Sequence, residues 1–276
     1  MSKTGPIGVF DSGYGGLTIL RELEKKLGDY DYLYLGDNAR SPYGNRSFET
    51  VYQYTLECVE WFFKQGCSLV ILACNTASAK ALRTIQQKNL PLIAPNKRVL
   101  GVIRPTTEIV GDYTRSGEIG IVATNGTVLS NSYPIEINKF FPSVKVYQQA
   151  CPMWVPLVEN NEEKGDGANY FIQQDLASLF KQSSSIDTLL LACTHYPLLK
   201  DKIEKYVPAG VKIITQGELV ANSLSNYLER HPEIAAACSK GGTIRFCTTD
   251  AEADFKGQAS HFYGRSIEAE TIHLAD

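Results

Sequence analysis

A short apolar run that stops at a cysteine constrains the fold of this chain more than any other feature. The run Leu69–Leu72 is unbroken and rich in branched side chains, which is typical of a parallel strand buried on both faces. Cys74 follows, and Asn75 and Thr76 can then begin the predicted helix 77–87. The thiol is therefore expected where open α/β sheets bind ligands and where a helix amino end favours a thiolate. A buried structural cysteine is the alternative.

The same pattern returns 119 residues later in the chain. There an apolar strand leads to Cys193, which Thr194 and His195 follow. A fainter match pairs the strand Ile7–Phe10 with the strand Ile119–Val122. Two halves of similar plan predict a pseudo-symmetric pair of thiols that face one cleft.

Strands and helices alternate along the sequence, which predicts an α/β fold. We expect two pseudo-symmetric domains, each a mainly parallel sheet flanked by helices, with the active site in the cleft between them. The first domain is predicted from residues 1–98 plus 214–276. The second is predicted from residues 99–213 and begins with a strand over Val99–Ile103. A chain of 276 residues can bury roughly three-quarters of its unfolded surface, which is enough for two such cores.

Composition argues against several classes of partner and location. A net charge of −3 without a Lys/Arg cluster argues against nucleic acid. No apolar stretch approaches the ~20 residues that a membrane span needs, so no membrane is expected as a partner. The first ten residues lack the basic and then apolar layout of a signal peptide, so we expect a cytoplasmic protein.

Cysteine and histidine usage bears on disulfides and metals. Seven cysteines are an odd number, and without a predicted export signal a disulfide framework is not expected. No CxxC occurs and the four histidines are scattered, a pattern that matches no zinc site. We therefore expect no metal.

A glycine-rich turn, DSGYGG, follows the first predicted strand. It lacks the GxGxxG spacing of dinucleotide-binding folds, although its glycines let backbone N–H groups approach an anion. Asp11 adds negative charge in that turn. Its carboxylate is either a helix cap or a group that handles a proton or binds an ammonium.

Two thiols on opposite sides of one carbon suit the removal of a proton on one face and its delivery on the other. Asp11 is a candidate acid–base partner for Cys74, and His195 for Cys193. A nucleophilic cysteine activated by His195 is the competing interpretation, but it leaves the second cysteine without a task. Neutral donors for the carboxylates of a small dianionic acid are expected from Asn75, Thr76, Thr124, Thr127 and Thr194.

Seven motifs along the chain together resemble those of glutamate racemases, in the aspartate/glutamate racemase superfamily. They are DSGYGG at 11–16, SPYG at 41–44, ACNTASA at 73–79, ATNGT at 123–127, ACPMWVPLVE at 150–159, ACTHYP at 192–197 and FCTTDAEADF at 246–255. The motifs occur in order and span the chain. One departure is Ala192, where the family usually has glycine before the second cysteine.

The resemblance implies an enzyme that interconverts L- and D-glutamate. Cys74 would handle the proton of D-glutamate and Cys193 that of L-glutamate. Asp11, Glu159 and His195 match the family's assisting acid–base residues. The positions that match its substrate contacts are Asp11, Ser12, Pro42, Tyr43, Gly44, Asn75, Thr76, Thr124, Thr127, Thr194 and His195.

The family also implies no cofactor, a cytoplasmic homodimer, and D-glutamate supplied for peptidoglycan.

Three alternatives to the assisting roles stay open: Asp11 as a helix cap, His195 as a structural histidine and Glu159 as a solvated loop charge. Two other functions also remain. One is a racemase of aspartate or another acidic amino acid, and the other is an amino-acid-binding regulatory protein.

Overall fold

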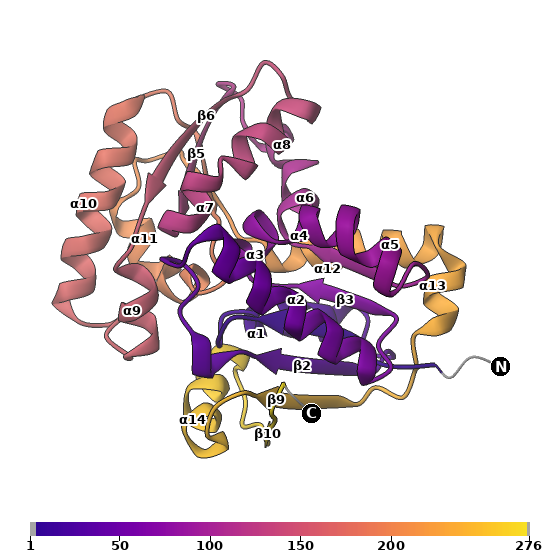
Figure 1. Cartoon of the computed structure of the whole chain (residues 1–276). Helices are drawn as coiled ribbons and strands as arrows, with labels where there is room; N and C mark the ends of the chain where they lie inside the picture. Colours follow the sequence, from indigo (N-terminus) through magenta and orange to yellow (C-terminus); the bar gives the residue numbers. More distant parts are fainter. Residues whose placement is uncertain (1–3, 275–276) are drawn as a thin grey trace.

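The computed structural model describes residues 4–274 and consists of two parallel sheets flanked by helices (Figure 1). The larger sheet has the strand order β10-β9-β2-β1-β3-β4, and the smaller has the order β6-β5-β7-β8. The strands of the larger sheet are β1 (Ile7–Asp11), β2 (Tyr32–Gly36), β3 (Leu69–Leu72), β4 (Arg98–Gly101), β9 (Ile244–Thr248) and β10 (Glu270–Thr271). Those of the smaller sheet are β5 (Glu118–Ala123), β6 (Lys145–Ala150), β7 (Thr188–Leu191) and β8 (Lys212–Ile214). This arrangement confirms the predicted α/β class.

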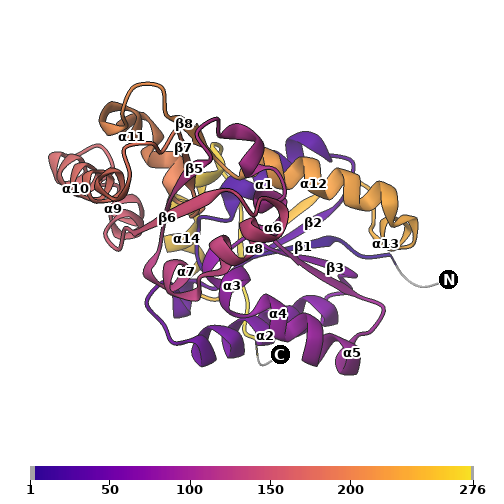
Figure 2. The same cartoon turned by 90° about the horizontal axis from the view of Figure 1, so that it is seen from above.

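The helices cover both faces of the larger sheet. Figure 2 shows α2, α4 and α5 on one face, and α1, α12 and α13 on the other. In the larger unit the helices are α1 (Leu17–Lys26), α2 (Phe48–Lys64), α3 (Asn75–Lys80), α4 (Leu82–Thr84), α5 (Leu90–Ile93), α12 (Gly217–Arg230), α13 (Pro232–Ala237) and α14 (Glu252–Tyr263). The helices associated with the smaller sheet are α6 (Ile103–Thr107), α7 (Asn125–Ser130), α8 (Ser132–Phe140), α9 (Trp154–Glu159), α10 (Asp166–Gln182) and α11 (Lys200–Tyr206).

The two sheets share one plan. The order β2-β1-β3-β4 in the larger sheet has its counterpart in β6-β5-β7-β8. β3 and β7 are therefore equivalent strands, and each is followed two residues later by a cysteine, Cys74 or Cys193. The strands β9 and β10, from near the carboxyl end of the chain, extend the larger sheet beyond β2. The predicted pseudo-symmetry of the two halves is confirmed at the level of strand order.

The strand near residue 99 does not open the second unit, and this part of the prediction is wrong. It is β4, it ends at Gly101, and it pairs with β3 in parallel from Leu69↔Arg98 to Leu72↔Gly101. Apolar pattern identifies a strand but not its partner, because pairing depends on residues far away in the sequence. The boundary at 213/214 stays a prediction. Residues 1–3 and 275–276 of the predicted first domain lie outside the described residues.

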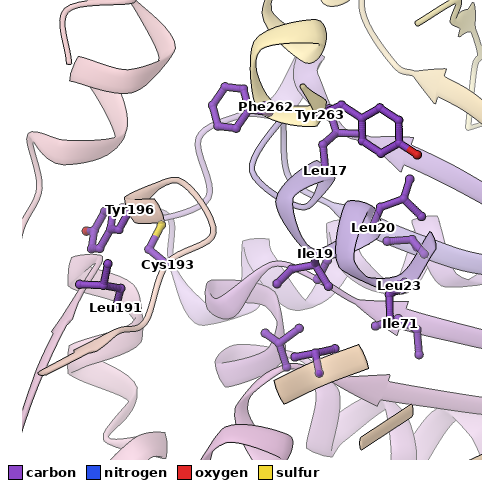
Figure 3. Close-up of a cluster of buried hydrophobic side chains, with 14 of the residues drawn as sticks. Leu17, Ile19, Leu20, Leu23, Ile71, Leu191, Cys193, Tyr196, Phe262 and Tyr263 are labelled. Carbon is purple, nitrogen blue, oxygen red and sulfur yellow. The ribbon is translucent and has the colours of Figure 1, made fainter. Parts of the chain in front are cut away.

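The core of the larger unit forms around both faces of β1. Val9 packs into the cluster beneath α1, whereas its neighbour Phe10 packs into the cluster beneath α2. The α1 leucines Leu17, Leu20 and Leu23 are buried at helical spacing. Figure 3 shows these leucines, and the same cluster continues across to Cys193 in the smaller unit. Each buried leucine contributes about 1.5–3 kcal/mol relative to an exposed one. The packing therefore holds the start of α1 close to the second cysteine.

The predicted helix after Cys74 needs correction at both ends. The helix expected over residues 77–87 begins earlier, at Asn75, and is broken after Lys80 into α4 and a π-helical turn, Ile85–Asn89. After β4 the chain forms α6 and then a 3₁₀ turn at Val110–Tyr113. Within residues 4–274, no helix is both long and apolar enough to span a bilayer.

Candidate active site

A pocket lies between the two sheets and receives residues from both. Its cavity of about 60 Å³ corresponds to room for about four to six water molecules, which suits a small solute. The predicted site residues that line it are Asp11, Ser12, Pro42, Tyr43, Gly44, Cys74, Asn75, Thr76, Thr124, Glu159, Cys193, Thr194 and His195. Thirteen residues from six separate motifs thus meet at one place.

Cys74 lies on the wall formed by the larger unit. It is the N-cap of α3, and its Sγ accepts a hydrogen bond from the amide of Ala77 at 3.4 Å. Ser12 Oγ lies 3.4 Å from the same sulfur. Burial, and then the negative charge of Asp11, raise the pKa of Cys74 to about 12, despite the two hydrogen bonds. This residue is therefore a thiol at neutral pH.

Cys193 lies on the wall formed by the smaller unit. Its Sγ is 3.9 Å from Nδ1 of His195, and His195 Nε2 is 2.9 Å from a carboxylate oxygen of Glu159. Burial alone would lower the pKa of His195, but the hydrogen bonds to Cys193 and Glu159 outweigh it and raise the pKa to about 10. Phe262 of α14 packs edge-on against the imidazole with 5.0 Å between ring centres. These contacts fix a cationic imidazole beside the second sulfur.

Asp11 ends β1 and is almost completely buried. Its Oδ2 accepts the amide of Gly13 at 3.0 Å, whereas Oδ1 has no hydrogen-bond partner among the described residues. Burial raises the pKa of Asp11, although the positive charge of His195 opposes the shift. An unpaired carboxylate oxygen beside a pocket is costly unless a ligand completes its hydrogen bonds. The position suits a bound ammonium group or a transferred proton.

The Pro42–Gly44 loop is held from behind by a buried ion pair. Asp37 is fully buried, accepts a bond from Arg40 Nε at 2.7 Å and also accepts the hydroxyl of Tyr43. Burial raises the pKa of Tyr43 far above its usual value, so the hydroxyl remains a donor. The ion pair therefore holds Asp37 in place, and Asp37 in turn holds the Tyr43 hydroxyl.

Two hydroxyls join the walls across the pocket. Thr76 Oγ1 of α3 lies 3.0 Å from Thr124 Oγ1, which caps α7. Thr127 was predicted to contact substrate, but it is not among the residues that line the pocket. Its Oγ1 instead accepts a hydrogen bond from Thr124 Oγ1 at 3.2 Å. Thr127 therefore supports Thr124 from outside the pocket lining.

Six residues line the pocket that the sequence did not single out as ligand contacts. They are Ser41, Asn45, Asn125, Pro152, Val155 and Pro156. The last two belong to the short helix α9. Pro156 occupies the third position of α9, where an amide has no partner inside the helix. Proline within a first helical turn was the signal that could have identified this helix.

The chain is similar to known racemases in both sequence and structure. Residues 7–224 match the model of the Asp/Glu/Hydantoin racemase family. The glutamate racemase of Persephonella marina is 43% identical over 270 residues, which cover 98% of this chain and 97% of the relative. Among solved structures, the glutamate racemase isoform RacE1 of Bacillus anthracis superposes with a TM-score of 0.88 at 34% identity, covering 99% of this chain and 98% of that one.

A second solved structure includes a bound amino acid. It is the glutamate racemase of Francisella tularensis in complex with D-glutamate, with a TM-score of 0.87, 31% identity and 98% of each chain covered. The family model spans most of the chain, and the relatives match it nearly from end to end. The chain belongs to the Asp/Glu/Hydantoin racemase family.

Proposed function

We propose that this protein is a glutamate racemase that interconverts L- and D-glutamate without a cofactor, through two cysteine bases. One observation carries the proposal: Cys74 and Cys193 follow equivalent strands of the two sheets and line the same small pocket. Full-length relatives named glutamate racemases support glutamate as the substrate. A racemase of aspartate or another acidic amino acid is the alternative, since both thiols would serve any such substrate.

The surroundings of the two sulfurs differ. His195 Nδ1 lies 3.9 Å from the Cys193 sulfur, whereas burial and the negative charge of Asp11 keep Cys74 protonated. L-glutamate would lose its α-proton to the Cys193 thiolate, and the Cys74 thiol would deliver a proton to the opposite face. In the reverse direction, Cys74 must first lose its proton, for which Asp11 is the nearby carboxylate.

The α-proton of an amino acid is weakly acidic, so the site must stabilise the carbanion. The substrate's own ammonium group lowers the barrier, and the unpaired oxygen of Asp11 is its proposed partner. Asn75, Thr76, Thr124 and Thr194 supply neutral donors for the carboxylates. These donors would offset the negative charge that develops next to the α-carbon.

Isotope labelling tests the two-base mechanism. In D₂O, early D-glutamate formed from unlabelled L-glutamate should contain deuterium, while the recovered L-glutamate should contain almost none. A single base that served both faces would return protium to the product or label both enantiomers alike, which would refute the mechanism.

Cysteine variants test the same mechanism independently of the label. Cys74→Ser and Cys193→Ser should each lose racemisation by about 10²–10⁴-fold. Cys74→Ser should retain proton exchange only on L-substrates, and Cys193→Ser only on D-substrates. Cys238→Ser is the matched control, because that buried cysteine does not line the pocket. A serine variant of either pocket cysteine that racemises at the parent rate would refute the two-thiol proposal.

The biological setting follows from the same family. We propose that the product D-glutamate is supplied for peptidoglycan, and that the protein acts as a cytoplasmic homodimer. An amino-acid-binding regulatory protein is a less favoured alternative, because a protein that only binds could lose either cysteine. Circular dichroism of each pure enantiomer of glutamate and aspartate, incubated with the protein, distinguishes all of these activities.

A further inference from the structure

A buried glutamine lies behind the pocket, between β8 and α12. Gln216 is 2% exposed, and its Oε1 accepts a hydrogen bond from Nδ2 of Asn75 at 2.7 Å. Its Nε2 donates toward the carbonyl of Val102 at 3.1 Å and toward Oγ1 of Thr106 at 3.0 Å. Val102 and Thr106 belong to the segment in which the chain first passes from the larger sheet to the smaller one, and Gln216 to the segment in which it returns. Figure 2 shows α6 and α12, the helices of these two segments.

Tyr133 of α8 completes the network. Its hydroxyl donates to Oδ1 of Asn75 at 2.6 Å and lies 2.8 Å from Nε2 of Gln216. Burial raises the pKa of Tyr133, so the hydroxyl keeps its proton. Both polar atoms of the Asn75 side chain are therefore held from behind, one by Gln216 and one by Tyr133.

We propose that Gln216 is a positioning residue that fixes the amide of Asn75 for substrate. Asn75 lines the pocket directly after Cys74, and its amide nitrogen carries two N–H groups. Gln216 takes one of them in a fixed direction, which leaves the other for a carboxylate of the ligand. Without Gln216, the amide of Asn75 could rotate, and binding would have to restore its orientation. This inference rests on the proposed function, because Asn75 is taken there to contact substrate.

The expected effect is on substrate binding. The equilibrium constant of a racemisation is one, so kcat/KM must change by the same factor in both directions for any variant. The separate KM values are therefore the diagnostic quantities. Gln216→Met, which keeps the size of the side chain and removes the amide, should raise KM about tenfold for both enantiomers, the equivalent of one hydrogen bond.

A double-mutant cycle separates positioning from a merely structural role. Asn75→Ala removes the group on which Gln216 is proposed to act. In that background Gln216→Met should have no further effect, so KM should change by less than about twofold. Twofold is the scatter with which the effects of independent sites combine. If the two substitutions multiply their effects on KM, or if Gln216→Met alone leaves KM within twofold of the parent, the inference is wrong.

Two further variants keep the test decisive. Ser78→Ala removes a buried hydroxyl on the same helix, α3, whose bonds go to the backbone of Leu72 and Val102, and it should lower the melting temperature without raising KM. An equal rise in KM for Ser78→Ala would show general loosening of α3 and overturn the inference. If Gln216→Met does not fold, Tyr133→Phe takes its place in the cycle with the same expected sign. A parent protein that racemises neither enantiomer refutes the proposed function, whereas an active parent with multiplying effects refutes only the role of Gln216.

Discussion

Gly15→Ala is expected to disable the site through a single added methyl group. Gly15 lies just before α1, and a Cβ placed on it would be 2.5 Å from Nδ1 and 2.7 Å from Cε1 of His195. The side chain of Thr194 would be closer still. Ordinary contact begins at 3.4 Å, so the imidazole would have to move by 3.4 minus 2.5 Å, or about 0.9 Å.

The size of the effect follows from what holds His195. Glu159 and Phe262 fix the ring on its other sides, so the displacement strains both contacts and changes the distance to Cys193. Overpacking of this kind costs about 1–3 kcal/mol of unfolding free energy. A misplacement near 1 Å in a catalytic group costs about 10²-fold in rate. We therefore expect racemisation to fall about 100-fold, with a modest loss of stability.

Circular dichroism of glutamate gives the rate, and urea unfolding gives the stability. Gly257→Ala is the matched control, because Gly257 is inside α14 and, apart from its chain neighbours and the helix's own backbone, no described atom lies within 4 Å of the new methyl group. That variant should gain about 0.5–1 kcal/mol and keep its activity. If Gly15→Ala racemises within threefold of the parent rate, the contact with His195 does not control the chemistry and the reasoning fails.

Three other outcomes can be measured on the same protein. The imidazolium of His195 is lost as pH rises through about 10, so the parent rate should fall there in a pH–rate profile, and the stability from its pairing should decline from pH 6.5 upward. His195→Asn should lack this alkaline decline. His195→Asn and Asp11→Asn should change single-turnover rates unequally in the two directions, and equal losses would assign these groups to binding or structure. Dialysis against a chelator should leave activity unchanged, and a visible absorption band typical of a bound aldimine would contradict cofactor independence.

The residues at strand ends were predictable from the sequence because their signals are local. Asp11, Cys74 and Cys193 each follow an apolar run at the point where a helix or turn begins. In parallel sheets, the carboxyl ends of neighbouring strands meet at one edge, so strand position alone brings such residues together. The equivalence of the two halves was visible for the same reason.

Features that depend on distant pairing could not be predicted in the same way. β4 was assigned to the wrong unit because only its partner, β3, decides which sheet it joins. Gln216 shows no local pattern in the sequence. Its hydrogen bonds to Asn75 and Val102 form only where the two segments that link the sheets pack together. Thr127 lies in the same motif as the predicted ligand contact Thr124, which caps α7. Its hydroxyl nevertheless accepts a hydrogen bond from Thr124.

The pairing of β9 with β2 has a consequence for synthesis of the protein. It joins Tyr32 to Ile244, two positions 212 residues apart, whereas the strands of the smaller sheet all lie between residues 118 and 214. A ribosome adds about 5–20 residues per second, so β2 waits about 10–40 s for its neighbour. During that interval its outer edge is an unpaired template for another strand. The nascent chain therefore completes its smaller sheet first and depends on β9, which is made much later, to pair the open edge of β2.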